Sequence, residues 1–228
     1  MRELGIDIET YSSEDLKTCG VYRYAESPDF TILLFAYCVD GGPVTCVDMA
    51  QGEQLPAEIL DALRDPAVVK TAFNATFERV CISRYYGWPL MDPSQWRCTM
   101  VAAARMGLPL SLEQCGVALN LERGKMAEGG ALIRFFSKPN TKGSRRLPSA
   151  APERWELFKQ YNIRDVEVEQ AVLAKVRRLA PAAFDDRLYV VDQLINDRGV
   201  LLDQELAANA MRYDDDYKAA LNEEAKQI

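Results

Sequence analysis

Apolar residues recur with two different spacings, and these divide the chain into expected strands and helices. Residues 2–10 alternate apolar and polar, whereas residues 30–39 are almost all apolar, as in a strand buried on both faces. The turn sequence DGGP at 40–43 predicts a hairpin with a partner strand at 44–49. A further strand is expected at 67–73, and helices are expected at 56–65, 74–87, 98–106, 111–119 and 152–178. This order predicts an α/β or α+β domain with a mixed sheet.

The first expected strand carries two acids on one face. Successive side chains of a strand point to opposite faces, so Gly5, Asp7 and Glu9 share the face opposite Leu4 and Ile6. Neighbouring carboxylates repel each other unless water or a cation lies between them. Roughly one D-x-E pair is expected by chance in a chain of this composition. The pair alone therefore does not establish a site.

The segment 152–178 places one acid on the apolar stripe of a helix. In steps of three or four, the stripe contains Trp155, Phe158, Tyr161, Asp165, Val168, Val172, Val176 and Leu179. A carboxylate on a buried stripe is costly unless it is paired, hydrogen-bonded or bound to a metal. Because Tyr161 precedes Asp165 by one turn, the two side chains can address one site. A structural Tyr–Asp hydrogen bond or ion pair is the alternative.

Glu78 is a further acidic candidate. It falls in the first turn of the helix that follows the 67–73 strand, and either Asn74 or Thr76 is expected to cap that helix. The helix dipole favours a carboxylate there whether or not it has a function. The position is also at the carboxyl end of a strand, where α/β sheets place their sites.

Composition narrows the possible chemistry. The 228 residues include no histidine, which excludes Ser-His-Asp catalysis, His-ligated zinc and imidazole bases. None of the six cysteines forms a C-x-x-C pair, so neither a disulfide framework nor a structural zinc site is expected. The longest apolar run, at 30–39, is too short to span a bilayer, and no secretory signal is visible. No membrane association and a cytoplasmic location are expected.

The charge distribution contains one basic island. The net charge of −7 argues against a protein that wraps duplex DNA, but not against one that grips a short single strand. The segment 134–146 contains no acid and five basic residues, which are Arg134, Lys138, Lys142, Arg145 and Arg146. With Phe135 and Phe136 beside them, these residues favour contact with a nucleic-acid backbone. A solvated, mobile loop is an equally good interpretation.

Together, three short motifs in this order resemble the DEDD exonucleases. They are Asp7-x-Glu9, Asn74-x-x-Phe77-Glu78 and Tyr161-x-x-x-Asp165. The tyrosine is typical of the DEDDy branch. From residue 4 to about 211 the chain resembles the 3′–5′ proofreading domain of bacteriophage family A (Pol I-like) DNA polymerases, including the segments WRCTMVAAARMGLPLSLEQCGVALNL and LYVVDQLINDRGVLLD. The second motif usually ends in Asp, where this chain has Glu78.

The resemblance implies a ribonuclease H-like fold with two divalent ions, Mg²⁺ or Mn²⁺. Asp7 would bridge both ions, Glu9 and Asp165 would complete the first site, and Glu78 would serve the second. Tyr161 would orient the attacking water. The residues expected to hold the substrate are Thr10, Asn74, Phe77, Arg145 and Arg146, although Phe77 is as easily a core residue.

The same resemblance predicts the domains and partners. Residues 1–180 would form the exonuclease domain, and residues 181–228 a helical segment resembling the start of a polymerase module. The expected partners are the 3′ end of single-stranded DNA and a polymerase module in cis or in trans. A phage-encoded chain would act in the host cytoplasm. Two alternatives stay open: an RNase D-like exoribonuclease, because the motifs do not read the 2′-hydroxyl, and an inactive nuclease fold retained for DNA binding.

Overall fold

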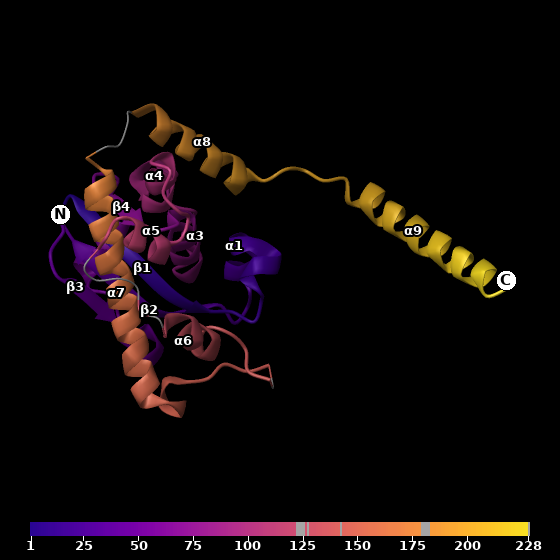
Figure 1. Ribbon diagram of the computed structural model, residues 1–228, viewed down its shortest axis with the longest axis horizontal. Coiled ribbons are helices and arrows are strands. Elements are labelled where there is room, and N and C mark those ends of the chain that lie inside the picture. The colour runs from indigo at the N-terminus through magenta and orange to yellow at the C-terminus, as the bar shows by residue number, and fades with distance from the viewer. Residues whose placement is uncertain (122–125, 127, 142, 179–182, 228) are drawn as a thin grey trace. The chain divides into compact units, whose positions relative to one another are not determined.

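The computed structural model describes the chain except for residues 122–125, 127, 142, 179–182 and 228. The unit Met1–Gln193 contains a five-stranded mixed sheet (Figure 1). Its strands are β1 (Glu3–Tyr11), β2 (Thr31–Val39), β3 (Val44–Val47), β4 (Val69–Ala72) and β5 (Trp96–Cys98), in the spatial order β3-β2-β1-β4-β5. Strand β2 is antiparallel to β1 and β3, whereas β4 is parallel to β1 and β5. The central strand is therefore the one that carries the two acids.

The described residues also form α-helices. They are α1 (Leu16–Glu26), α2 (Ala57–Arg64), α3 (Ala75–Tyr85), α4 (Thr99–Arg105), α5 (Leu112–Ala118), α6 (Gly129–Phe136), α7 (Pro152–Val176), α8 (Ala183–Arg198) and α9 (Gln204–Ala225). Three short 3₁₀ helices, η1 (Met49–Gln51), η2 (Pro93–Gln95) and η3 (Pro148–Ala150), occur between them.

The two faces of β1 have different neighbours. Leu4, Ile6 and Ile8 are buried in a core cluster with side chains from α2 and α3. On the opposite face, α7 packs against the sheet, where Val166 contacts the Ala36 side of β2. Since alternate residues of a strand take opposite faces, α7 lies on the face that Asp7 occupies. The alternation predicted for the first strand is confirmed.

Most predicted elements are present with small shifts at their ends. The hairpin is formed as expected, and Asp40 and Gly41 have φ values of 49° and 74° in its turn. The predicted side-chain cap of α3 was wrong. Asn74 stands at the N-cap with φ 76° and makes no cap hydrogen bond, whereas the Thr76 hydroxyl donates to Gln193 Oε1 at 2.7 Å.

Besides the short 3₁₀ helices, two α-helices and one strand were missed. Helix α1 is interrupted by Gly20, whose φ of 75° breaks the helical period, and β5 has only three residues. Helix α6 begins with two glycines, which are poor helix formers. Its last residues, Arg134, Phe135 and Phe136, belong to the segment that was predicted to be a basic loop, so that loop begins only after α6.

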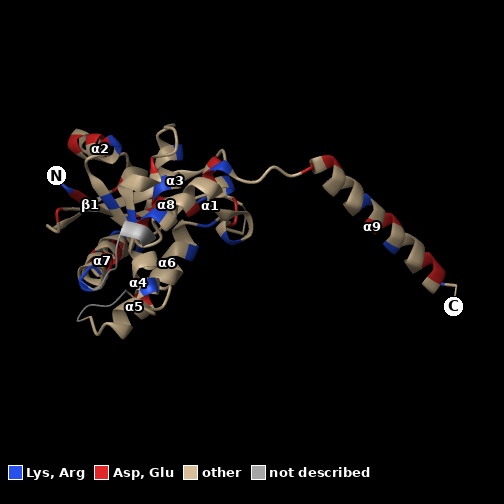
Figure 2. Cartoon of the chain, turned by 90° about the horizontal axis from the view of Figure 1, so that it is seen from above, with Lys and Arg blue, Asp and Glu red and all other residues tan. Residues whose placement is uncertain are grey.

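The described chain divides into two compact units, Met1–Gln193 and Leu194–Ile228. The second unit contains α9, which buries none of its residues and carries charges of both signs along its length (Figure 2). The division into an exonuclease domain at 1–180 and a polymerase junction at 181–228 stays a prediction. All six cysteines are free. None of the helices in the described ranges combines the length and apolarity needed to cross a bilayer.

Candidate active site

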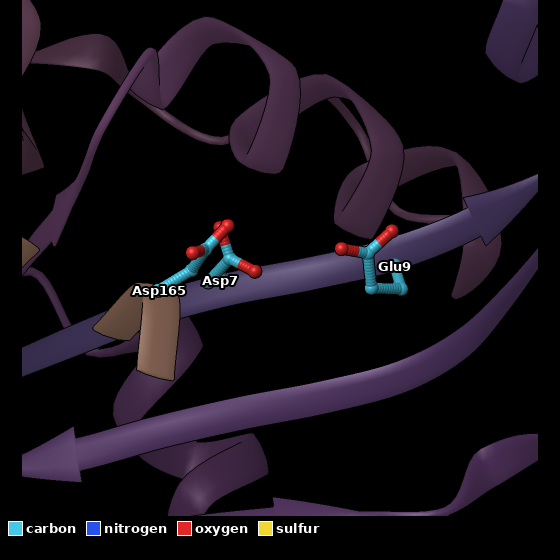
Figure 3. Close-up of side chains that lie close together, drawn as sticks. All are labelled: Asp7, Glu9 and Asp165. Atoms are coloured by element: carbon cyan, nitrogen blue, oxygen red, sulfur yellow. The ribbon is translucent and has the colours of Figure 1, made fainter. Parts of the chain in front are cut away.

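Three acids from two elements meet beside the central strand. Asp7 and Glu9 project from the same face of β1, and Asp165 reaches them from α7 (Figure 3). One carboxylate oxygen of each lies within 4.8 Å of the others. We call Asp7, Glu9 and Asp165 the acid cluster. Residues 158 positions apart in sequence therefore form one potential ligand set, as the sequence predicted.

The environment of the acid cluster suits a divalent cation. Glu9 and Asp165 are buried, and Asp7 is partly buried. Carboxylates held together away from water repel one another, and a cation between them removes that repulsion. Oxygen donors are the preferred ligands of Mg²⁺ and Mn²⁺. The residues present thus fit the predicted metal ligands.

Glu78 lies near the acid cluster but is not part of it. It is buried in the first turn of α3, and among the described residues no hydrogen-bond donor reaches its Oε2. Burial, and then the charge of Asp7, raises the pKa of Glu78 well above its ordinary value. A buried acceptor without a donor is unusual in a native protein, and a cation would satisfy it. The structure therefore groups three of the four predicted ligands and places the fourth within electrostatic reach.

Tyr161 is held beside the acid cluster. Its side chain is 1% exposed, and its hydroxyl bonds to Asp165. Burial, followed by the charges of Glu9, Asp165 and Asp7, raises the pKa of Tyr161. The phenol therefore stays protonated at any physiological pH. It can donate one hydrogen bond while its oxygen accepts another.

Asn162 is a site residue that the sequence analysis missed. Its Nδ2 donates to the Asp7 carboxylate Oδ2 at 2.6 Å and to the Asp7 carbonyl at 3.1 Å. The Cys46 thiol donates to the Asn162 Oδ1 at 3.6 Å. Because both Asp7 partners are oxygen acceptors, the amide nitrogen faces Asp7, and the amide oxygen faces Cys46. The fully buried Asn162 thus ties α7 to β1 and orients the Asp7 carboxylate.

A second buried stripe of α7 explains why Asn162 was missed. Asn162, Val166, Glu169 and Leu173 follow one another at helical spacing, and all four are buried. Only the neighbouring stripe through Asp165 was considered in the sequence. Two polar residues, Asn162 and Glu169, recur on this second stripe among apolar ones, and this pattern could have predicted buried polar contacts there.

Glu169, on the same stripe, has partners of its own. The Thr99 hydroxyl donates to Glu169 Oε1, and Gln170 Nε2 donates to Oε2 at 2.8 Å. Gln170 also donates to the Thr71 hydroxyl at 3.0 Å. Burial raises the pKa of Glu169 to about 7, against the opposing effect of these hydrogen bonds. This network joins α7 to α4 and β4, and Glu169 is a structural acid.

The predicted substrate residues around α3 differ in accessibility. The Thr10 hydroxyl is buried and lies 2.9 Å from the Tyr24 hydroxyl. Asn74 is exposed. Phe77 is half-buried, and its ring centroid lies 6.0 Å from that of Tyr24. The Asn74 side chain is therefore at the surface, Phe77 packs partly against the core, and the Thr10 side chain is engaged in the core.

The two predicted arginines also have different surroundings. Arg146 donates to the Phe135 carbonyl at 3.1 Å, and its guanidinium lies 4.7 Å from the Phe135 ring centroid. Arg145 lies close enough to Tyr11, at the end of β1, for its charge to lower the pKa of that phenol against a larger effect of burial. Lys142 and Leu179, also considered in the sequence, lie outside the described residues.

Comparison with known proteins agrees with this geometry. A DNA polymerase of Bacillus phage SP02 is 48% identical over 234 residues, an alignment that covers 100% of this chain. The chain is a relative of this polymerase. It spans about a third of the polymerase, since the aligned part is 36% of that protein. The predicted resemblance to phage DNA polymerases is confirmed. No protein-family model matches the chain.

Solved structures confirm the fold of this polymerase relative. Escherichia coli RNase D, an exoribonuclease involved in structured RNA processing, matches with a TM-score of 0.53 at 15% identity, over 88% of this chain and 46% of RNase D. Brucella melitensis NrnC with bound Mg²⁺ matches with a TM-score of 0.51 at 12% identity, over 85% of this chain and 83% of NrnC. The predicted ribonuclease H-like fold is confirmed.

Proposed function

We propose that the chain is a metal-dependent 3′–5′ exonuclease that removes nucleoside 5′-monophosphates from single-stranded DNA ends. The observation that carries this proposal is the acid cluster, with the Tyr161 hydroxyl bonded to one of its members. In this proposal the activity serves proofreading by a phage DNA polymerase, whose polymerase module acts in cis or in trans.

The proposed roles follow from the site geometry. Asp7 and Glu9 from β1 and Asp165 from α7 would hold two divalent ions, with Glu78 serving the second. When bound, such ions supply Lewis-acid chemistry that activates water and stabilises the leaving 3′ oxygen. Tyr161 keeps its proton and orients the attacking water through its hydroxyl. The Asn162 amide keeps the Asp7 carboxylate in one orientation throughout.

The relatives support the proposed substrate and metal to different degrees. The 48% identical relative is a DNA polymerase, which supports a DNA substrate. RNase D, which shares the fold at 15% identity, is an exoribonuclease and keeps RNA as the competing substrate. The Mg²⁺ bound by NrnC supports magnesium as the ion, and Mn²⁺ fits the same oxygen donors.

The test is degradation of a 5′-labelled single-stranded DNA oligonucleotide, with an RNA twin in parallel. Reactions contain Mg²⁺, Mn²⁺ or EDTA, and Asp165→Ala is the control. We expect a metal-dependent ladder that shortens from the 3′ end, is weaker on RNA and is lost in the variant. A stronger ladder on RNA would instead make the chain a ribonuclease of the RNase D kind.

A catalytically inactive DNA-binding module is the second candidate. The observation in its favour is Glu78, which stands where related motifs have Asp and lies outside the acid cluster. This candidate predicts tight binding of the strand with no ladder in either metal. In that case Glu78→Asp is the variant to test, because the shorter side chain restores the usual residue.

A further inference from the structure

Helix α6 packs on α7 beside the candidate active site. Its buried residues Gly129, Leu132 and Phe136 lie at helical spacing and form one face. This face joins an apolar cluster with α7, and the two helices are neighbours in Figure 1. Within the cluster, the rings of Phe136 and Phe158 are stacked at 5.5 Å, and those of Phe158 and Tyr161 at 6.2 Å. Tyr161 is therefore the last ring of an aromatic stack that begins on α6.

Gly129 is where the α6 backbone approaches that last ring. A Cβ at this position would lie 2.0 Å from Cε2, 2.6 Å from Cδ2 and 2.7 Å from Cζ of Tyr161. No Cβ occupies such distances in a folded protein, so one of the two groups would have to move. Gly129 is helical and does not have a positive φ, so its backbone conformation suits any residue. Glycine is required there for space alone.

The Tyr161 ring can make room for a methyl group at position 129 only if its hydroxyl moves as well. Its ring is 1% exposed and stacked on the fully buried Phe158, so the edge facing Gly129 cannot retreat without rotation or tilt of the ring. The atom nearest to a new methyl group is Cε2, which is bonded to Cζ, the carbon that carries the hydroxyl. The hydroxyl, in turn, is bonded to Asp165 and feels the charges of Glu9 and Asp7. Any movement of the Tyr161 ring therefore also moves its hydroxyl oxygen, the atom proposed to orient the attacking water.

We propose that Gly129 is a positioning residue for Tyr161: the bare backbone of α6 closes on the ring and sets where its hydroxyl lies relative to the acid cluster. This inference rests on the proposed exonuclease function. It assigns α6, which carries no acid of the site, a part in orienting the attacking water.

The next residue provides a matched control. A Cβ at Gly130 meets no atom within 4 Å, and Gly130 is exposed in the same turn of the same helix. Both Gly129→Ala and Gly130→Ala raise helix propensity equally. They differ in the contact with Tyr161.

The experiment measures kcat and KM of the full chain on 5′-labelled single-stranded DNA at saturating Mg²⁺. We expect Gly129→Ala to lower kcat by about 10- to 100-fold with little change in KM, since misplacement by about 1 Å has that effect. Gly130→Ala should keep the wild-type kcat. Equal rates for the two variants would overturn the proposal.

A double variant separates positioning from general damage. If Gly129 acts through the Tyr161 hydroxyl, Gly129→Ala should add no further loss in a Tyr161→Phe background, where the hydroxyl is absent. A further loss of tenfold or more would show that the methyl group harms the site by another route and would contradict the proposal. If Gly129→Ala alone does not fold, Tyr161→Ala should restore folding by making room for the methyl, and failure of that rescue would also contradict it.

A readout without activity keeps this inference separate from the proposed function. The ten tyrosines are labelled with 3-fluorotyrosine, and Tyr161→Phe identifies the ¹⁹F resonance of Tyr161. That resonance should shift in Gly129→Ala and stay in place in Gly130→Ala. An inactive wild type with this pattern would overturn the exonuclease function while keeping the contact. An unshifted resonance would overturn the contact itself.

Discussion

Asp165 and Glu169 stand one turn apart on α7 and are buried to almost the same degree, with exposures of 4% and 2%. Their surroundings differ. Glu169 receives hydrogen bonds from Thr99 and Gln170 on its two carboxylate oxygens and is not a member of the acid cluster. Asp165 shares its space with the carboxylates of Asp7 and Glu9. The comparison teaches that burial alone does not mark a functional acid. A better mark is the close approach of other carboxylates, whose mutual repulsion a bound cation relieves.

The largest difference between the two acids should appear in activity. We expect Asp165→Asn to reduce the exonuclease rate by roughly 1,000-fold or more, as removal of a core catalytic group does. Glu169→Gln keeps the shape and a hydrogen-bonding side chain, so its rate should stay within about threefold of wild type. Initial rates on the labelled DNA oligonucleotide measure both. A similar loss in the two variants would remove the distinction.

The pH dependence of stability should show the second difference. The pKa of Glu169 is about 7 in the folded protein and thus above its unfolded value. The folded state therefore holds this proton more tightly, and the resulting stability is fully present below about pH 4.5. It is lost as pH rises to about 7, and amounts to at most about 3 kcal/mol.

Glu169→Gln does not titrate and should lack this contribution. Urea unfolding of both proteins between pH 4.5 and 8 gives the difference in free energy of unfolding, in which the titration of the acid cluster cancels. The stability of wild type relative to the variant should fall with rising pH. A difference that is constant across this range would mean that Glu169 is already ionised.

Asn162 allows a test of the surroundings of the acid cluster, because its amide donates to Asp7. Asn162→Ala removes the donor to Asp7, and we expect kcat to fall about tenfold, together with a loss of about 1–3 kcal/mol in stability from the buried groups left behind. Gln160→Ala is the control, because Gln160 is exposed on the same helix and bonds only weakly to Glu156 at 3.5 Å. An unchanged kcat in Asn162→Ala would limit Asn162 to a structural role.

The smallest expected effect concerns the two arginines. Arg145→Gln should reduce the dependence of log Kd for single-stranded DNA on log salt concentration by about 0.7, the value for one phosphate contact. Arg146→Gln should change this slope less, because its guanidinium already packs on Phe135. Binding titrations at several salt concentrations test both. Equal slopes in wild type and the two variants would mean that Arg145 does not contact the DNA backbone.

Local patterns in the sequence were sufficient for four of the five strands, for α7 and for the faces on which Asp7, Glu9 and Asp165 lie. The alternation of β1 placed Asp7 and Glu9 on one face, and the stripe of α7 placed Asp165 among apolar residues. In both cases the spacing of residues along the sequence directly determines which face of the strand or helix they occupy. The resemblance then joined them into one site, which no local pattern could do.

The missed features depend on contacts between distant parts of the chain. In the sequence, Gly129 is only a poor helix former. The need for glycine at this position is apparent only in the fold, where Tyr161, 32 residues later, lies against it. Helix α1 was hidden because Gly20 interrupts its period. Arg145 and Arg146 are adjacent and chemically identical, so only the ring of Phe135 tells them apart.

Calorimetric titration of Mn²⁺ into wild type, Asp165→Asn and Glu169→Gln tests the central claim most directly, because it needs no substrate. We predict that wild type and Glu169→Gln bind the ion with similar affinity, whereas Asp165→Asn binds it at least about tenfold more weakly. Binding that is equal in all three proteins, or absent from wild type, would contradict the assignment of the acid cluster as a metal site.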